Sequence, residues 1–168
     1  ALLAGLAIGG LNGLFVSRGI EPFLVTLATL GIAQGIALFI NPVPGGTVPA
    51  AFRALAGYQG AMPTVLPLLV VLALVALWSI RRSRIGTYLV AVGDNKEAAY
   101  LCGVPVRRTL IATYVLSALF AALAALFLVA RTSTGDPTIG ARFTIDSLAA
   151  VVLGGTVLGG GRVSMLGT

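Results

Sequence analysis

The sequence predicts an all-α protein built as a polytopic transmembrane helix bundle. Of its 168 residues 58% are hydrophobic and 10% charged, whereas about a quarter of the residues of a soluble domain are charged. Several apolar runs approach the roughly 20 residues that cross the hydrocarbon of a bilayer. Basic residues gather in one connection between these runs, which is the pattern that orients membrane proteins. We therefore expect membrane lipid to be part of the solvent of this chain.

The apolar runs define the expected helices. Three are long enough, or nearly so, to span a bilayer: residues 22–40, 62–80 and 109–130. Residues 1–17 look like the remainder of a further span. Residues 145–158 are too short and too rich in glycine to cross alone, so we expect a short or re-entrant broken helix near the C-terminus. Residues 1–168 are then one partial transmembrane domain, a fragment of a longer protein.

The basic residues predict the orientation. Residues 81–108 hold six of the eleven Lys and Arg residues: Arg81, Arg82, Arg84, Lys96, Arg107 and Arg108. The connection 41–61 holds only Arg53. Because cytoplasmic loops carry the excess of Lys and Arg, residues 81–108 are expected to be a cytoplasmic loop and 41–61 an external one. Alternation then places Arg18 in a cytoplasmic turn and residues 131–143 outside.

Small residues recur at helical spacing. Gly5, Gly9 and Gly13 share one face of the first helix, and Gly31 and Gly35 share one face of the second. A small-residue face is also expected in the run 109–130: Thr113, Ser117, Ala118, Ala121, Ala122 and Ala125. Small faces let helix backbones approach closely within a bilayer. They predict helix packing rather than the lining of a pore.

The composition also argues against several classes of function. The net charge of +6 comes from basic residues between apolar runs, so it predicts membrane orientation and no nucleic-acid partner. The sequence has no histidine and a single cysteine, Cys102, which excludes an internal disulfide, zinc sites and Ser-His catalysis. We expect no metal, no cofactor and no enzymatic activity of this chain.

A short helix is expected inside the basic loop. Asp94 is placed as its N-cap, with Glu97 three residues later in capping-box spacing. Gly103 supplies a C-terminal stop, and Pro105 prevents continuation. Two turns are unstable in water unless they dock on something. The apolar face formed by Ala98, Leu101 and Cys102 therefore indicates either a docking element for a cytosolic partner or a structured turn between spans.

The C-terminal region holds a second candidate site. Five glycines, from Gly154 to Gly161, fall within eight residues, and irregular backbone at membrane depth is tolerated where it is buried in protein or lines a cavity. Such backbone would hydrogen-bond a polar solute, although close helix crossing or a cytoplasmic turn explains the glycines too. Asp146 is either an intramembrane functional acid or, as we favour, a charge at the N-terminus of a helix, where Thr144 or Asp146 would cap a helix beginning near Ser147. The candidate substrate-path residues are Asp146, Gly154, Gly155, Thr156, Gly159 and Gly160.

Three segments resemble a known family. Residues 93–106, GDNKEAAYLCGVPV, resemble the cytoplasmic coupling loop of the permease subunits of ribose-type ABC sugar importers, with a Gly-x-Asn, an Ala-Ala pair and then Gly-Val. Residues 22–30, PFLVTLATL, and 148–160, LAAVVLGGTVLGG, resemble the same family in the same order. Asp94 and Cys102 depart from its pattern, although neither disturbs the helix and its stop.

The resemblance implies the permease subunit of an ATP-driven importer, multi-pass in the bacterial inner (plasma) membrane, that forms the path of a monosaccharide or similar small polar solute. Its implied partners are an ABC ATPase subunit, an extracytoplasmic substrate-binding protein and a second permease subunit, expected as a homodimer. The glycine-rich stretch 155–161 lacks the Lys-Ser/Thr of a P-loop, so ATP hydrolysis is expected on the separate ATPase. The residues expected to couple to that ATPase are Asp94, Asn95, Glu97, Ala98, Ala99, Leu101, Gly103, Val104 and Pro105.

Three other functions stay open at this point. A permease of the branched-chain amino-acid ABC importers would share the architecture, although Asn95, the Ala98-Ala99 pair and Gly103 favour sugar. An ATP-independent channel or carrier would need no docking loop. An intramembrane enzyme is disfavoured by the missing histidine and by the lack of a paired-carboxylate motif.

Overall fold

The computed structural model describes residues 2–46, 49, 58–59, 62–63, 82 and 84–154. In this part of the chain the structure is helical apart from two short paired strands. The elements in chain order are α1 (Leu2–Ser17), α2 (Pro22–Ile40), β1 (Tyr58–Gln59), β2 (Met62–Pro63), α5 (Arg84–Asp94), α6 (Lys96–Leu101), α7 (Val106–Thr132) and α8 (Gly140–Leu153). The strands are antiparallel, with Tyr58 opposite Pro63.

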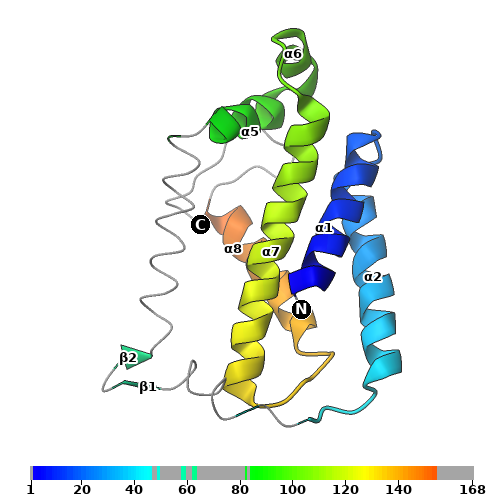
Figure 1. The fold of residues 1–168 in the computed structure, drawn as a ribbon, viewed down its shortest axis with the longest axis vertical. Coiled ribbons are helices and arrows are strands. Elements are labelled where there is room, and N and C mark those ends of the chain that lie inside the picture. Colours follow the sequence, from blue (N-terminus) through cyan, green and yellow to red (C-terminus); the bar gives the residue numbers. More distant parts are fainter. Residues whose placement is uncertain are drawn as a thin grey trace.

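The long helices run side by side and the short ones gather at one end (Figure 1). α1, α2 and α7 form the shaft of the molecule, and α8 passes behind α7 in this view. α5 lies across one end of the shaft, and α6 projects beyond it. The turn between α7 and α8 lies at the opposite end, together with the segment that follows α2.

Two of the helices are long and apolar enough to cross a membrane, judged by length and composition. They are α2, with a mean hydropathy of 2.1, and α7, with 2.3. At 1.5 Å per residue their 19 and 27 residues are about 28 Å and 40 Å long, against about 30 Å of hydrocarbon. Their side chains are largely unburied: Phe39 is 90% exposed, and Val25 is the one buried residue of α2. An apolar surface of this kind suits lipid or further protein.

The helix bounds agree with the sequence in some places and differ in others. α2 coincides with the expected run 22–40, because Pro22 has the preset backbone angle of a first helical residue. α7 is longer than the expected 109–130 at both ends, since it begins directly after Pro105 and ends where Ser133 takes a left-handed conformation (φ 57°). The expected span 62–80 begins in β2 instead of a helix, and its remainder, residues 64–80, lies outside the described residues.

α5 was not expected, because residues 81–108 were interpreted as a loop with one short helix. Its sequence, RIGTYLVAVGD, buries Gly86 and Val92. The apolar side chains of Ile85 and Val90 are 59% and 57% exposed. The period of its apolar residues is that of an amphipathic helix. The sequence analysis missed this period because it interpreted the basic segment 81–108 as a loop.

α1 and α7 cross closely and run antiparallel. A Cβ added at Gly5 would lie 2.9 Å from the Cβ of Ala122, and one at Gly13 would lie 2.7 Å from the Cα of Ile111. At Gly9 it would lie 2.7 Å from both the Cβ of Ala118 and the carbonyl oxygen of Tyr114. The predicted packing role of the Gly5, Gly9 and Gly13 face is confirmed. Ala118 and Ala122 of α7 belong to the small-residue face that the sequence predicted in the run 109–130.

The other glycine pair has no such contact. A Cβ at Gly31 or Gly35 would meet no atom within 4 Å, as far as the described structure extends. The glycine spacing in α2 therefore does not mark a crossing between described helices. On α1 the residue Asn12 is 9% exposed, and its buried Oδ1 atom has no hydrogen-bond partner among the described residues.

Candidate functional site

The start of α6 is fixed by Asn95. Its backbone is extended (φ −153°, ψ 111°), and its Oδ1 accepts hydrogen bonds from the amides of Glu97, at 3.0 Å, and Ala98, at 3.1 Å. The side-chain oxygen thus satisfies two of the amides that a helix start leaves unpaired. The prediction that Asp94 is the N-cap is wrong, because Asp94 is the last helical residue of α5 and only Asn95 has the extended backbone of a cap.

The end of α6 is fixed by Gly103. Its φ of +79° lies in the left-handed region that favours glycine. The amide of Gly103 donates to the carbonyl of Tyr100 and the amide of Val104 donates to that of Ala99, both at 3.0 Å. These two bonds form a Schellman motif. The predicted glycine stop is confirmed, and Pro105 follows as the N-cap of α7.

α6 buries one alanine and exposes its larger apolar side chains. Ala99 is 4% exposed, whereas Tyr100 is 73% and Leu101 84% exposed. Ala98 and Cys102 are also exposed. A helix of six residues capped at both ends therefore presents apolar side chains to its surroundings at the tip of the molecule (Figure 1). Such a projection is suited to contact with another protein.

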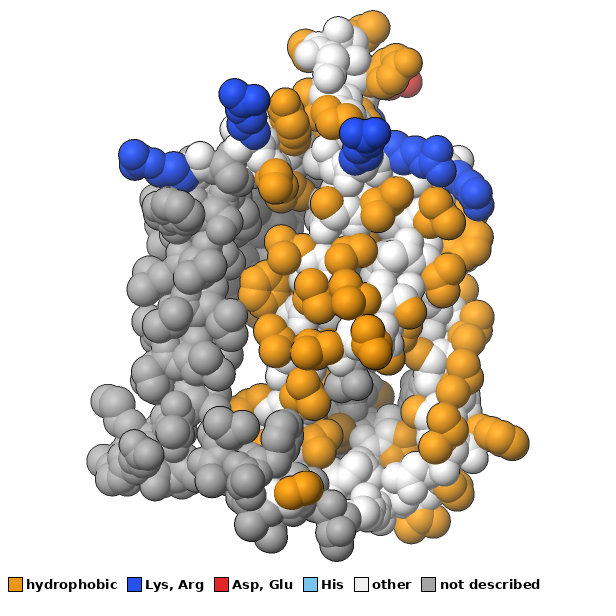
Figure 2. All heavy atoms as spheres, viewed as in Figure 1, with side chains coloured by type: hydrophobic (Ala, Val, Ile, Leu, Met, Phe, Trp, Pro, Cys, Tyr) orange, Lys and Arg blue, Asp and Glu red, His pale blue; other side chains and the backbone are white. Residues whose placement is uncertain are grey.

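Arginine side chains surround the base of this projection. Figure 2 shows Lys and Arg side chains at the end of the molecule where α5 and α6 lie, above a shaft covered by hydrophobic side chains. Arg82 and Arg84 lie at the start of α5, and Arg107 and Arg108 in the first turn of α7, all of them exposed or partly exposed. The α6 end is therefore basic.

The second candidate region begins differently from the prediction. α8 starts at Gly140 rather than near Ser147. Thr144 and Asp146 therefore lie inside the helix, where the Thr144 hydroxyl donates to the carbonyl of Gly140 at 3.3 Å. The interpretation of Thr144 or Asp146 as N-cap is wrong, and Asp146 is an exposed residue of the second turn.

Asp136 orders the turn before α8. Its Oδ1 accepts hydrogen bonds from the hydroxyl of Thr138, at 2.7 Å, and from the amide of Thr138, at 2.8 Å. The side-chain bond, and then the backbone bond, lower the pKa of the Asp136 carboxyl from its ordinary value. Local hydrogen bonding of this kind holds the chain in a turn.

The predicted glycine-rich break is described only at its start. Gly154 is the C-cap of α8, with φ −69° and ψ 0°. The remaining candidate path residues, Gly155, Thr156, Gly159 and Gly160, lie outside the described residues. Asp146 thus lies within α8, and Gly154 lies at its C-terminal cap.

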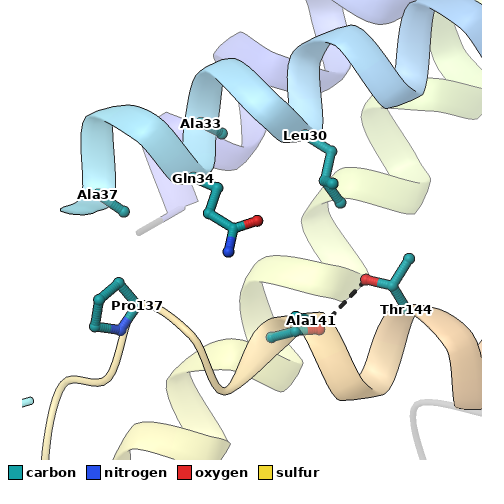
Figure 3. Close-up of a pocket in the computed structure, with 8 residues that line it drawn as sticks. Leu30, Ala33, Gln34, Ala37, Pro137, Ala141 and Thr144 are labelled. Atoms are coloured by element: carbon teal, nitrogen blue, oxygen red, sulfur yellow. Dashed lines mark hydrogen bonds between the residues drawn. The ribbon is translucent and has the colours of Figure 1, made fainter.

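An open hollow lies between α2 and the start of α8 (Figure 3). Its volume is about 280 Å³, and its lining comprises Leu30, Ala33, Gln34, Ala37, Pro137, Gly140, Ala141 and Thr144. Gln34 extends from α2 toward the α8 side of the hollow. The sequence analysis missed Gln34, although it is the one amide side chain in the run 22–40 and a polar group of that kind is costly in an apolar helix.

Backbone hydrogen bonds close the end of the molecule beside this hollow. Gly45 and Gly135 exchange two of them, at 3.1 Å and 3.0 Å. The Nδ2 of Asn41 also donates to the carbonyl of Gly135, at 3.2 Å. The segment after α2 is thereby tied to the segment between α7 and α8, from which Pro137 enters the lining of the hollow.

The described residues define the class of the protein: it is α-helical, with two apolar helices of membrane-spanning length in the described part of the chain and a capped helix that projects from one end. The chain belongs to the family described as "Branched-chain amino acid transport system / permease component", which matches residues 1–168. Membership makes it a membrane protein of the permease type, as the resemblance implied.

Similar proteins with curated names are import permeases. The chain is 35% identical over 175 residues to the ribose import permease protein RbsC of Escherichia coli K12, covering 100% of this chain and 54% of the relative. It is 37% identical over 163 residues to RbsC of Bacillus subtilis, covering 94% and 50%. The fructose import permease protein FrcC of Rhizobium meliloti is 36% identical over 182 residues, covering 99% and 51%. The chain spans about half the length of these relatives, and no solved structure matches it significantly.

Proposed function

We propose that this chain is part of the permease subunit of an ATP-driven ABC importer that carries a monosaccharide or a similar small polar solute. The observation that carries the proposal is the match over the full chain to permeases named for ribose and fructose import. The family description names branched-chain amino acids, but the similar proteins with curated names favour a sugar. ATP hydrolysis is assigned to a separate subunit.

The α6 end is the proposed docking site of the ATPase subunit and faces the cytoplasm. The exposed Tyr100 and Leu101 would enter a pocket of the partner, and the buried Ala99 would transmit its movement to α5 and α7. The caps at Asn95 and Gly103 support this role, because they hold six residues helical that would not be stable alone. Asp94, Glu97, Ala98, Val104 and Pro105 complete the proposed coupling segment.

The solute path is proposed to run along α8 and the glycine-rich stretch that follows it. Rocking of the helices, driven by closure of the ATPase pair, would open the path alternately to each side. Asp146, Gly154, Gly155, Thr156, Gly159 and Gly160 remain its candidate residues. The proposal includes an extracytoplasmic substrate-binding protein, a second copy of the subunit, and a multi-pass location in the bacterial inner membrane.

The substitution Leu101→Asp tests the coupling role. The full-length subunit would be reconstituted with its ATPase and binding protein, and solute uptake and ATP hydrolysis would be measured. Because a central apolar contact at an interface is worth about 2 kcal/mol or more, Leu101→Asp is expected to lower both by about tenfold or more. Leu101→Met is the matched control and should retain activity. Undiminished uptake by Leu101→Asp would contradict docking at α6.

Labelling of the exposed Cys102 tests the orientation. Any cysteine that the full-length protein has outside residues 1–168 would first be replaced by serine. A membrane-impermeant maleimide is then expected to react with Cys102 in inside-out vesicles and not in right-side-out cells. Reaction from outside would reverse the topology, and with it the docking of a cytosolic ATPase.

A further inference from the structure

Gln34 differs from the other polar side chains of α2 in what its polar atoms contact. The hydroxyl of Thr26 donates to the carbonyls of Pro22 and Phe23, at 3.0 Å and 3.1 Å. The hydroxyl of Thr29 donates likewise to the carbonyls of Val25 and Thr26. Both threonines thus bond to their own helix. The Gln34 amide forms no hydrogen bond with any group in the described part of the chain, and it extends into the hollow (Figure 3).

An unpaired amide in an apolar helix predicts a polar partner. A primary amide offers two N–H donors and one carbonyl acceptor. Transfer of such a group from water to apolar surroundings is unfavourable unless hydrogen bonds replace those with water. Apart from Thr144, whose hydroxyl donates to the Gly140 carbonyl, the side chains that line the hollow with Gln34 are apolar: Leu30, Ala33, Ala37, Pro137 and Ala141. The partner must therefore enter the hollow from outside the described structure.

The hollow has the size and the chemistry of a small-molecule subsite. Its volume of about 280 Å³ lies just below the roughly 300–1,000 Å³ that is typical of ligand pockets. Alanine methyl groups form its walls, and a few polar atoms, those of Gln34 and Thr144, face it. The Thr144 hydroxyl uses its proton on the Gly140 carbonyl, so its oxygen is left to accept a hydrogen bond.

The charge of the lining selects among solutes. None of the described residues that line the hollow carries a charge. An amino acid brings an ammonium and a carboxylate, each of which is costly to desolvate without an opposite charge. A sugar brings neutral hydroxyls, which both donate and accept. The hollow therefore suits a neutral polyhydroxy solute better than an amino acid.

We propose that the hollow between α2 and α8 is a binding subsite for a neutral, hydroxyl-rich solute, with Gln34 as the hydrogen-bonding residue that orients it. The inference rests on the proposed import function and names a place and a residue for it. The hydrogen bonds of Asn41, Gly45 and Gly135 join the segment after α2 to the segment before α8. The α2 and α8 sides of the hollow are therefore positioned before the solute binds. The alanine methyl groups contact the C–H surfaces of the sugar.

The first experiment measures transport. The full-length subunit, with its ATPase and binding protein in proteoliposomes, would carry Gln34→Leu, and uptake of D-ribose and of D-fructose would be followed against concentration. Loss of two hydrogen bonds to the solute is expected to lower kcat/KM by about tenfold or more. Thr29→Val is the matched control on the same helix, because that hydroxyl bonds only to its own backbone, and it should retain wild-type transport. Wild-type kinetics of Gln34→Leu would overturn the proposal.

The second experiment does not depend on how Gln34→Leu folds. A single cysteine is placed by Ala141→Cys in the full-length subunit that carries Cys102→Ser and in which any cysteine outside residues 1–168 is replaced by serine. Its rate of alkylation by a small maleimide is then measured. D-ribose or D-fructose in excess is expected to slow alkylation several-fold, and L-leucine is expected to have no effect. Equal rates with and without both sugars would overturn the subsite, as would protection by L-leucine alone. Disulfide crosslinking of the introduced thiol between two copies would show that the hollow is a subunit contact instead.

The results separate the subsite from the function on which it rests. If the reconstituted system imports D-ribose or D-fructose while Gln34→Leu transports normally and neither sugar slows alkylation of the Ala141→Cys variant, the permease assignment holds and the subsite is refuted. If the system imports L-leucine and no sugar, the proposed function itself fails.

Discussion

The crossing of α1 and α7 and the hollow between α2 and α8 differ in how closely the helices approach. In the first, glycines of one helix lie against alanines and backbone of the other, and no space is left for a methyl group at Gly9. In the second, a hollow of about 280 Å³ lies between the helices. Elsewhere on α2, a Cβ added at Gly31 or Gly35 would meet no described atom within 4 Å. Glycine spacing in a membrane helix therefore does not by itself predict a crossing.

The two helix pairs also differ in how firmly their helices are held together. Close backbone approach gives the many short-range dispersion contacts that hold helices together when no hydrophobic effect drives them. The α1–α7 pair is accordingly the fixed frame of the described structure. The α2–α8 pair is held at one end by the bonds of Asn41, Gly45 and Gly135 and has an open hollow along its side.

The largest effect is expected from Gly9→Ala. The added Cβ would lie 2.7 Å from the carbonyl oxygen of Tyr114 and 3.0 Å from the Cα of Val115, and backbone yields little. Overpacking of this kind costs about 1–3 kcal/mol, so the midpoint of thermal unfolding in detergent should fall clearly. The neighbouring Gly10→Ala is the matched control, because its Cβ would meet no described atom within 4 Å. Equal stability of the two variants would refute the close crossing.

A moderate effect is expected from Asn41→Leu, which removes the donor to the Gly135 carbonyl. One hydrogen bond contributes about 1 kcal/mol. We therefore expect faster amide hydrogen exchange in residues 41–46 and 133–139, read by mass spectrometry, and an unchanged rate in α1 and α7. Thr26→Val serves as the control, because its hydroxyl bonds only within α2. Uniform acceleration across all helices would mean that these bonds tie the whole fold rather than one end.

The smallest effect is expected from Asp136, and it depends on pH. Hydrogen bonds from Thr138 lower the pKa of this carboxyl in the folded state, so its contribution to stability is present above the unfolded pKa of about 3.8 and is lost as the pH falls through the lowered folded value. The wild type should exceed Asp136→Ala in thermal stability at neutral pH, and the difference should vanish in acid. A difference that persists at a pH below the folded pKa would contradict this account.

The α5–α6 region shows where local sequence rules succeed and where they do not. Gly103 was predicted as a helix stop, because glycine commonly ends a helix and Pro105, two residues later, cannot continue it. Asp94 and Asn95 both have capping side chains, and the choice between them depends on where the preceding helix ends. α5 was not expected, so Asp94 was assigned the role that Asn95 performs. The error at Thr144 and Asp146 has the same origin, since α8 begins earlier than its apolar run.

The sequence by itself determined the helical class, the bounds of α2, the stop at Gly103 and the small-residue stripe of α1. These features depend on composition and on residues a few positions apart, where period and capping act. Only the tertiary structure decided that α7 is the partner of the α1 stripe, that Gly45 pairs with Gly135, and that Gln34 shares a hollow with Pro137 and Ala141. Such pairings join residues far apart in the chain, and they are decided by which helix surfaces fit together rather than by any local pattern.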